Sequence, residues 1–125
     1  MPRKNTLSRY PILSAGDASG SLVSAVTCIE YLDNVGIQAN IVSGTPTGTL
    51  DIQVSADYVQ VPGVTGSQVT SNGNWVTVTS QAITSGSPAQ TYFDLNQLSS
   101  HFVRLIYTAA SGSGTLSAFI VGKSV

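Results

Sequence analysis

Residues 35–42, with the sequence VGIQANIV, decide the fold class of this chain. Every second side chain is apolar, and the intervening positions include two amides. The apolar positions are Val35, Ile37, Ala39 and Ile41. Period-two alternation of this kind is typical of a half-buried β-strand. The pattern resumes in residues 50–54, LDIQV, after a stretch rich in turn residues at 43–48. We therefore predict a β-hairpin made of these two strands.

Further short strands are expected on both sides of this pair. The runs that predict them are 21–32 (one bent strand or two), 75–79, 91–95, 102–108 and 115–121. The last two runs carry apolar residues on both faces, which is typical of central strands in a packed sheet. Seven or eight antiparallel strands separated by turns predict an all-β fold, a single β-sandwich of jelly-roll or immunoglobulin-like type.

Two irregular segments interrupt the strand pattern. Residues 56–73 contain several glycines and a proline, which predicts a long loop with a short strand at Tyr58–Val61. Residues Leu95–Ser100 are consistent with a single helical turn, for which Asp94 or Asn96 is available as the cap.

The composition points to a structural or binding protein. With 125 residues, the chain is long enough for one domain with one core. Charged residues make up 9% of it, against about 25% in ordinary soluble proteins. The net charge of −1 argues against a nucleic-acid binder, which would carry a broad basic face. Ser and Thr together account for 31 residues, and such a neutral, hydroxyl-rich surface suits an extracellular surface or a large assembly.

The charge is divided between the N-terminus and the rest of the chain. Arg3, Lys4 and Arg9 give the first nine residues a formal charge of +3, whereas the remainder has two basic and six acidic residues, a charge of −4. We therefore predict an extended N-terminal arm at residues 1–20 and a β-sandwich domain at residues 21–125. The arm is the candidate partner contact, and its contact residues are Arg3, Lys4, Arg9 and Tyr10.

Few residues suited to catalysis or metal binding are present. His101 is the only histidine, and no Gly-x-Ser-x-Gly nucleophile motif occurs. One Cys and one His do not make a usual zinc site, and no Asp-x-Asp-x-Asp-Gly calcium loop is present. Cys28, the only cysteine, is expected to be a buried free thiol. We expect a protein that is not an enzyme and that has no cofactor and no metal.

Two further groups of side chains suggest contacts. Tyr58 and Trp75 are candidates for stacking against a sugar, although aromatic residues more commonly fill the edge of a core. Arg104 lies in an otherwise apolar strand and needs a partner. Asp94 or Glu30 could pair with it if it is buried, and a neighbouring subunit could do so if it is exposed.

Several segments resemble small structural proteins of tailed and marine bacteriophages. They are LDNVGIQ (32–38), TPTGTL (45–50), FDLNQL (93–98), FVRLIY (102–107) and SGSGTL (111–116). The resemblance covers residues 32–125 apart from the loop at 56–73. It implies an accessory protein of the virion with a β-sandwich body, of the capsid decoration, head-fibre or tail-associated kind. In such proteins the segment before the sandwich often provides the attachment, which here is residues 1–20.

These observations together predict a capsid decoration, or cement, protein that binds the outer surface of a phage head. Its expected partner is the major capsid protein or another virion protein, and self-association into a homo-oligomer, a trimer in particular, is expected. A head-fibre or tail module and a carbohydrate-binding adhesin for host attachment are the alternatives. We expect no nucleic-acid or membrane partner. No secretory signal or membrane span is seen, so synthesis in the host cytoplasm and a final location on the capsid surface are expected.

Overall fold

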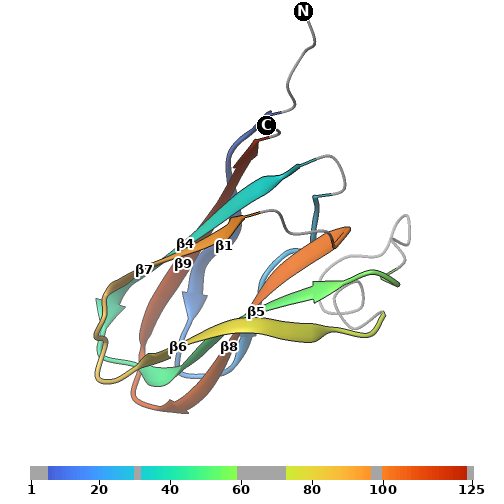
Figure 1. Cartoon of the computed structure of the whole chain (residues 1–125). Helices are drawn as coiled ribbons and strands as arrows, with labels where there is room; N and C mark the ends of the chain where they lie inside the picture. Colours follow the sequence, from blue (N-terminus) through green and yellow to red (C-terminus); the bar gives the residue numbers. More distant parts are fainter. Residues whose placement is uncertain (1–5, 30–31, 59–72, 97–99, 124–125) are drawn as a thin grey trace, which may run out of the picture.

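The computed structural model describes residues 6–29, 32–58, 73–96 and 100–123, which form two packed β-sheets (Figure 1). The strands are β1 (Thr6–Asp17), β2 (Leu22–Val23), β3 (Thr27–Cys28), β4 (Asn34–Gly44), β5 (Thr47–Ser55), β6 (Val76–Ile83), β7 (Gln90–Asn96), β8 (Phe102–Ser111) and β9 (Gly114–Lys123). The predicted all-β sandwich is confirmed.

The strand order identifies the sandwich as a jelly roll. Sheet A has the order β1-β9-β4-β7, and sheet B has the order β2-β8-β5-β6, with β3 also paired to β8. Because β2 and β3 follow one another along the same strand, they act as one interrupted strand, and each sheet then has four strands. Every pairing is antiparallel, and most connections pass from one sheet to the other. Two four-stranded sheets wound in this way are the jelly-roll arrangement.

The core lies between the sheets and consists of the inward side chains of alternating positions. On β4 and β9 these are Val35, Ile37, Ala39, Leu116, Ala118 and Ile120, and on β5 and β8 they are Leu50, Ile52, Val103, Leu105 and Tyr107. Burial of each large aliphatic side chain stabilises the fold by about 1.5–3 kcal/mol. The strands β8 and β9 have neighbours on both sides, so the expectation that the last two strands are central is confirmed.

The predicted hairpin of residues 35–54 is wrong, although both of its strands exist. Strand β4 pairs with β7 and β9 in sheet A, whereas β5 pairs with β6 and β8 in sheet B. Between them Gly44 has a φ of +82°, and Pro46 is buried, so the turn carries the chain from one sheet to the other. Alternation shows which face of a strand is buried, but it does not identify the neighbouring strand.

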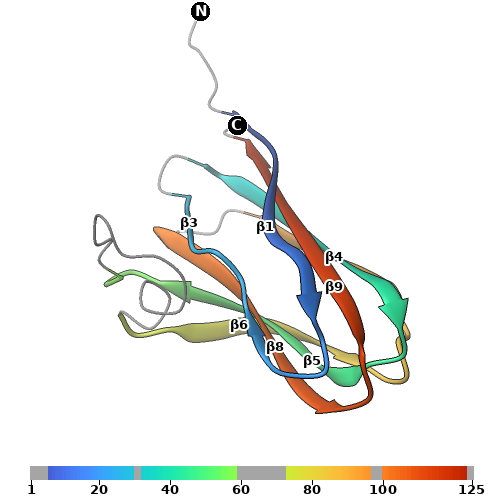
Figure 2. The same cartoon turned by 180° about the vertical axis from the view of Figure 1, so that it is seen from behind.

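Four of the crossings between the sheets meet at one end of the sandwich, which we call the turn end (Figures 1 and 2). It comprises residues 18–21, 45–46, 84–89 and 112–113. Backbone hydrogen bonds join these turns, and they run from Ala18 N to Gly114 O (2.9 Å), from Thr45 N to Ser113 O (3.0 Å) and from Gly86 N to Pro46 O (2.8 Å). The turn end is therefore closely joined, and its chain consists mainly of small, uncharged residues.

The boundary predicted at residue 20 is wrong for Thr6–Asp17, which forms β1. This strand pairs with β9 from Thr6 opposite Lys123 to Asp17 opposite Thr115, and its Ile12 side chain is buried in the core. Three register shifts interrupt the pairing, and Ala15 has a φ of +50°. These irregularities break the period-two pattern, which explains why charge and polarity suggested an arm. Residues 1–5 lie outside the described ranges.

The structure also bears on three smaller expectations. The run 21–32 contains two short strands, β2 and β3, and the Cys28 thiol is exposed rather than buried. Cys28 lies opposite Phe102 at the start of β8, beyond the closely packed centre. In the proposed helical turn, Leu95 and Asn96 belong to β7, and 97–99 lie outside the described residues. In the short strand predicted at Tyr58–Val61, residues 59–61 also lie outside the described residues.

Between β2 and β3, Ser24 and Ala25 join the two sheets along one side of the sandwich. The Ser24 side chain is 1% exposed. Its N–H donates to Leu105 O (2.9 Å), and its Oγ accepts from Leu105 N (2.8 Å) and donates to Ala25 O (3.0 Å). Ala25 N in turn donates to Ile12 O on β1 (2.9 Å). Ser24 therefore satisfies backbone groups of β8, and the adjacent Ala25 links the same segment to β1.

We predict that Ser24→Ala lowers the free energy of unfolding by about 1–3 kcal/mol, because the Leu105 amide loses its acceptor in a buried position. Urea denaturation followed by tryptophan fluorescence measures the loss. Ser113→Ala is the matched control, since Ser113 is exposed and only its backbone carbonyl bonds the neighbouring turn, and it should change stability by less than about 0.5 kcal/mol. Equal losses in the two variants would contradict the assigned role.

Candidate functional site

The candidate contact residues of the N-terminus are divided by the structure. Arg3 and Lys4 lie outside the described residues, and Arg9 and Tyr10 belong to β1. The Arg9 Cζ lies 4.7 Å from the centroid of the Phe119 ring on β9, so this guanidinium covers the outer face of sheet A. Tyr10 lies on the edge strand β1, opposite Ile120, whose side chain faces the core. The Tyr10 residue itself is 55% exposed.

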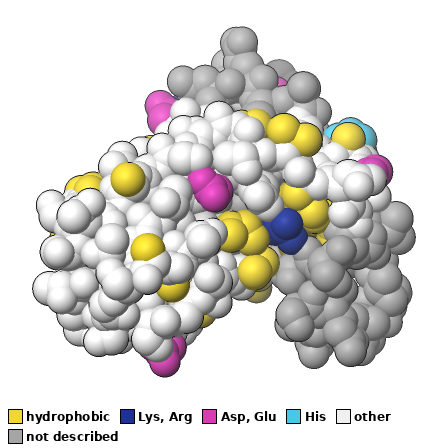
Figure 3. Space-filling model, turned by 90° about the horizontal axis from the view of Figure 1, so that it is seen from below, with side chains coloured by type: hydrophobic (Ala, Val, Ile, Leu, Met, Phe, Trp, Pro, Cys, Tyr) yellow, Lys and Arg dark blue, Asp and Glu magenta, His cyan; other side chains and the backbone are white. Residues whose placement is uncertain are grey.

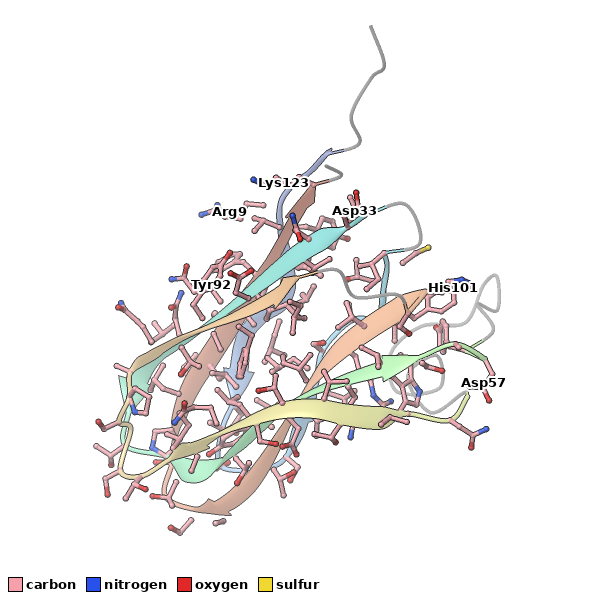
Figure 4. The ribbon with its side chains drawn as sticks, viewed as in Figure 1. Arg9, Asp33, Asp57, Tyr92, His101 and Lys123 are labelled. Atoms are coloured by element: carbon pink, nitrogen blue, oxygen red, sulfur yellow. The ribbon has the colours of Figure 1, made fainter. Side chains whose placement is uncertain are left out.

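A groove of about 210 Å³ crosses the outer face of sheet A, and we call it the outer groove. All four strands of the sheet contribute to it. Its lining residues are Arg9 from β1, Phe119 and Val121 from β9, Gly36, Gln38 and Asn40 from β4, and Tyr92 from β7. Figure 4 shows Arg9 and Tyr92 extending from the same side of the sheet. The groove combines two aromatic rings, two amides and one cation.

Arg9 and Tyr92 form the two walls of the outer groove because both lean inward from the edge strands. Tyr92 is 58% exposed, and its ring extends from β7 over Gly36 of β4. A Cβ at position 36 would collide with the Tyr92 hydroxyl and would lie 2.7 Å from Cζ. The absence of a side chain at Gly36 therefore permits the observed position of the tyrosine ring.

The floor of the groove is set by strand register. Gln38 of β4 lies opposite Tyr92 on one side and Phe119 on the other, so three outward side chains form one row across the sheet. Gln38 Nε2 donates to Asn40 Oδ1 (3.1 Å), which aligns the two amides. Within the described part of the chain this bond leaves Gln38 Oε1 as an acceptor and Asn40 Nδ2 as a donor toward the groove.

Sequence reasoning missed Tyr92, Phe119 and Gln38 as a group, although a signal for two of them was present. In β7 and β9 the neighbouring positions Phe93 and Ile120 face the core, so the strict alternation places Tyr92 and Phe119 outward. Large aromatic side chains on the outward face of a strand are unusual in a chain whose sequence is so rich in Ser and Thr. Their proximity depends on the pairing of β4 with both β7 and β9.

Tyr58 and Trp75, the candidate sugar contacts, lie in the connection between β5 and β6 and form an aromatic cluster with Phe102 of β8. The ring centroid of Tyr58 lies 4.9 Å from that of Phe102 and 5.6 Å from that of Trp75. Tyr58 is only 5% exposed, so its ring has no free face for stacking. Trp75 is half-buried, and the Arg104 Cζ lies 4.2 Å from its ring centroid. The observed contacts of both residues are packing contacts, and sugar binding by them stays a prediction.

Arg104 is held on the outer face of sheet B by Gln53. Its Nε and Nη2 donate to Gln53 Oε1, at 3.0 and 2.8 Å. Partial burial lowers the pKa of this guanidinium. Of the two acids proposed as partners, Asp94 belongs to β7 of the other sheet and Glu30 lies outside the described residues. Figure 3 shows hydrophobic side chains gathered around a basic group on the face seen from below.

Asp57 fastens the two ends of the long connection between β5 and β6. Its Oδ1 accepts from the Asn74 backbone N–H (2.8 Å) and from Ser55 Oγ (2.9 Å), and its Oδ2 accepts from Asn74 Nδ2 (2.6 Å). These hydrogen bonds, those from Asn74 above all, lower the pKa of the Asp57 carboxyl to about 2. These three hydrogen bonds tie the carboxylate to its own loop.

Little else in the described residues suggests chemistry. His101 is exposed and lies, like Asp57, at the end of the sandwich opposite the turn end (Figure 4). Among the described residues, no group of three His, Cys, Asp or Glu side chains could hold a metal ion. In the same ranges no helix has the length and apolar character needed to cross a bilayer.

The strand order makes this chain a jelly-roll β-sandwich protein. Comparisons with known proteins agree with that fold. No protein-family model and no curated protein sequence matches the chain. The SPBc2 prophage-derived protein YomS has a similar structure, with a TM-score of 0.57 at 10% identity, over 97% of this chain and 96% of that chain. A protein of the Bacillus endospore appendages, described as a novel family of disulfide-linked pili, aligns with a TM-score of 0.41 at 15% identity, over 98% of this chain and 88% of that chain. The likeness to YomS shows a shared fold over almost all of both chains.

If Tyr58 acts through packing, Tyr58→Ala should lower the free energy of unfolding by about 3–5 kcal/mol. Tyr58→Phe should change it by less than about 1 kcal/mol, because the buried hydroxyl has no hydrogen-bond partner among the described residues. Thermal and urea denaturation of the two variants measure the difference. A large loss in Tyr58→Phe would instead assign the hydroxyl a polar partner.

The Asp57 carboxylate should make stability depend on pH in the acid range. Its pKa in the folded protein is about 2, below the ordinary value of 3.8, so the stability that it contributes is present above pH 3.8 and is lost as the pH falls through about 2. Asp57→Asn should therefore flatten the fall of the urea midpoint between these pH values. Asp94→Asn, which replaces an exposed carboxylate on the other sheet, is the matched control for the substitution itself.

Proposed function

We propose that this protein is a non-enzymatic structural protein of a phage virion, a decoration or cement subunit bound to the outside of the capsid. The observation that carries the proposal is the jelly-roll fold shared with a prophage-derived protein over nearly the whole of both chains. The resemblance of residues 32–125 to small phage structural proteins points the same way. Jelly rolls are common in viral capsid proteins, which is an argument by analogy.

The surface of the molecule suits an assembly in which neighbours cover it. The chain has 9% charged residues, and the turn end consists largely of Ser, Gly and Thr. Strand β6 is an edge of sheet B, contains no charged residue, and exposes Val76 at 63% and Val78 at 43%. Edge strands are usually protected by charge or proline. An unprotected edge supports self-association, for which a trimer is the expected form.

The attachment to the capsid is assigned to the N-terminal segment. Arg3 and Lys4 precede β1, an edge strand of sheet A, and the exposed Tyr10 ring lies on the same strand. These residues would meet an acidic surface formed by neighbouring coat subunits. Bridging between coat subunits stabilises the shell by mass action, because the protein binds only the assembled state. Arg9 is not included in this contact, because its guanidinium covers Phe119 and lines the outer groove.

The test is co-sedimentation of the purified protein with capsids that lack it. Wild type should bind to saturation, and the double variant Arg3→Ala/Lys4→Ala should bind at least about tenfold more weakly, because two charge-assisted contacts are lost. The substitutions are preferable to removal of residues 1–20, because such a deletion would remove β1 from sheet A.

Lys123→Ala is the control for the loss of a positive charge and should bind like wild type, since its single charge is removed from β9 and not from the N-terminal segment. If neither wild type nor any variant binds capsids, the cement function is rejected, and a head-fibre or tail-associated module becomes the better candidate. Saturable binding that the double variant retains would keep the decoration function and reject the N-terminal contact.

A further inference from the structure

We propose that the outer groove binds a carboxylate-bearing saccharide. The inference goes beyond the attachment to the capsid, and it rests on different residues. The groove has a volume of about 210 Å³, below the roughly 300–1,000 Å³ of sites that enclose a drug-sized ligand. It therefore fits part of a chain that lies across the sheet better than an enclosed small molecule.

The charge of the groove selects an acidic ligand. Arg9 is its only charged lining residue among those that the structure describes. The Arg9 Cζ lies 4.7 Å from the centroid of the Phe119 ring, and this contact holds the guanidinium over β9 while its N–H groups can still donate. A carboxylate is the planar acceptor that matches this fork of donors.

The orientation of the ligand follows from the opposite edge of the sheet. Asp94 lies on β7, opposite Gly36 and two residues beyond Tyr92, and its side chain is exposed. A carboxylate placed there would be repelled. The acid group of the ligand therefore belongs at the β1 side, next to Arg9, and an uncharged ring belongs at the β7 side, against Tyr92.

The remaining side chains provide what a sugar ring needs. The exposed Tyr92 ring offers an apolar surface on which the C–H face of a pyranose can lie, whereas the Phe119 ring is covered by the Arg9 guanidinium and supports that cation. Between them Gln38 and Asn40 present an amide acceptor and an amide donor, which suit hydroxyl groups that both donate and accept. Because Gly36 lets the Tyr92 ring lie over β4, the aromatic wall is in place before the ligand arrives.

Saccharide fits this surface better than nucleic acid. A nucleic-acid site needs several cations along a backbone, and the chain has five Lys and Arg residues in total with a net charge of −1. The outer groove contains one of them.

The first experiment is a glycan array that carries carboxylated glycans, with uronic or sialic acid, and matched neutral glycans. Wild type should bind carboxylated glycans selectively. The strongest carboxylated glycan and its methyl ester are then titrated calorimetrically into wild type and variants. Wild type should prefer the free acid by at least about tenfold, and Arg9→Gln should remove that preference. Tyr92→Ala should weaken the binding of acid and ester alike.

Gly36→Ala provides a test in which no binding group is removed. The added methyl group displaces the Tyr92 ring, which can swing into solvent, so binding should fall at least about fivefold while the melting temperature stays close to that of wild type. Lys123→Gln and Val42→Ala are controls on β9 and β4 outside the groove, and both should bind like wild type.

The proposal is overturned if wild type binds no glycan on the array, or if it binds acids and neutral glycans equally. It is also overturned if Tyr92→Ala and Arg9→Gln leave the affinity unchanged while each remains folded by circular dichroism. The same variants are assayed for capsid co-sedimentation, in which Tyr92→Ala should behave like wild type. Failure of the saccharide site and failure of the capsid contact are therefore distinguishable.

Discussion

The packing of the inward faces of the two sheets is the constraint on which the rest of the structure depends. Along each central strand every second side chain is buried between the sheets, as in the row formed by Ile37 and Ile120 in sheet A and by Ile52 and Leu105 in sheet B. These positions are committed to stability. The outward positions, the edges and the connections are what remains for contact with other molecules.

The two outer faces use their outward positions differently. On sheet B, Arg104 donates to Gln53 and covers Trp75, so the cation and the aromatic ring satisfy one another within the fold. On sheet A, Arg9 covers Phe119 but Tyr92 stands apart on the far edge strand, and a groove is left between them. A similar set of residue types therefore gives a packed cluster on one face and an open surface on the other.

The proposed capsid contact and the proposed saccharide site depend on different residues. The first depends on the segment that precedes β1 and on Tyr10 at its edge, and the second lies across the middle of the outer face. None of the residues proposed for the capsid contact lines the outer groove. Stabilisation of a shell and display of a sugar-binding surface are compatible in such an arrangement, because neither uses the side chains that the other requires.

Alternation in the sequence determined the strands, their buried faces and the all-β class, since a period of two is a local property of a half-buried strand. It placed residues 35–42 and 50–54 correctly as strands and wrongly as partners, because pairing is decided by contacts between distant segments. Strand β1 escaped detection for a related reason, since its register shifts against β9 disrupt the alternation. A candidate cation, Arg9, was recognised from charge alone. Only the tertiary structure placed it beside Phe119, Gln38 and Tyr92, because those neighbours depend on β9 and β4 lying between β1 and β7.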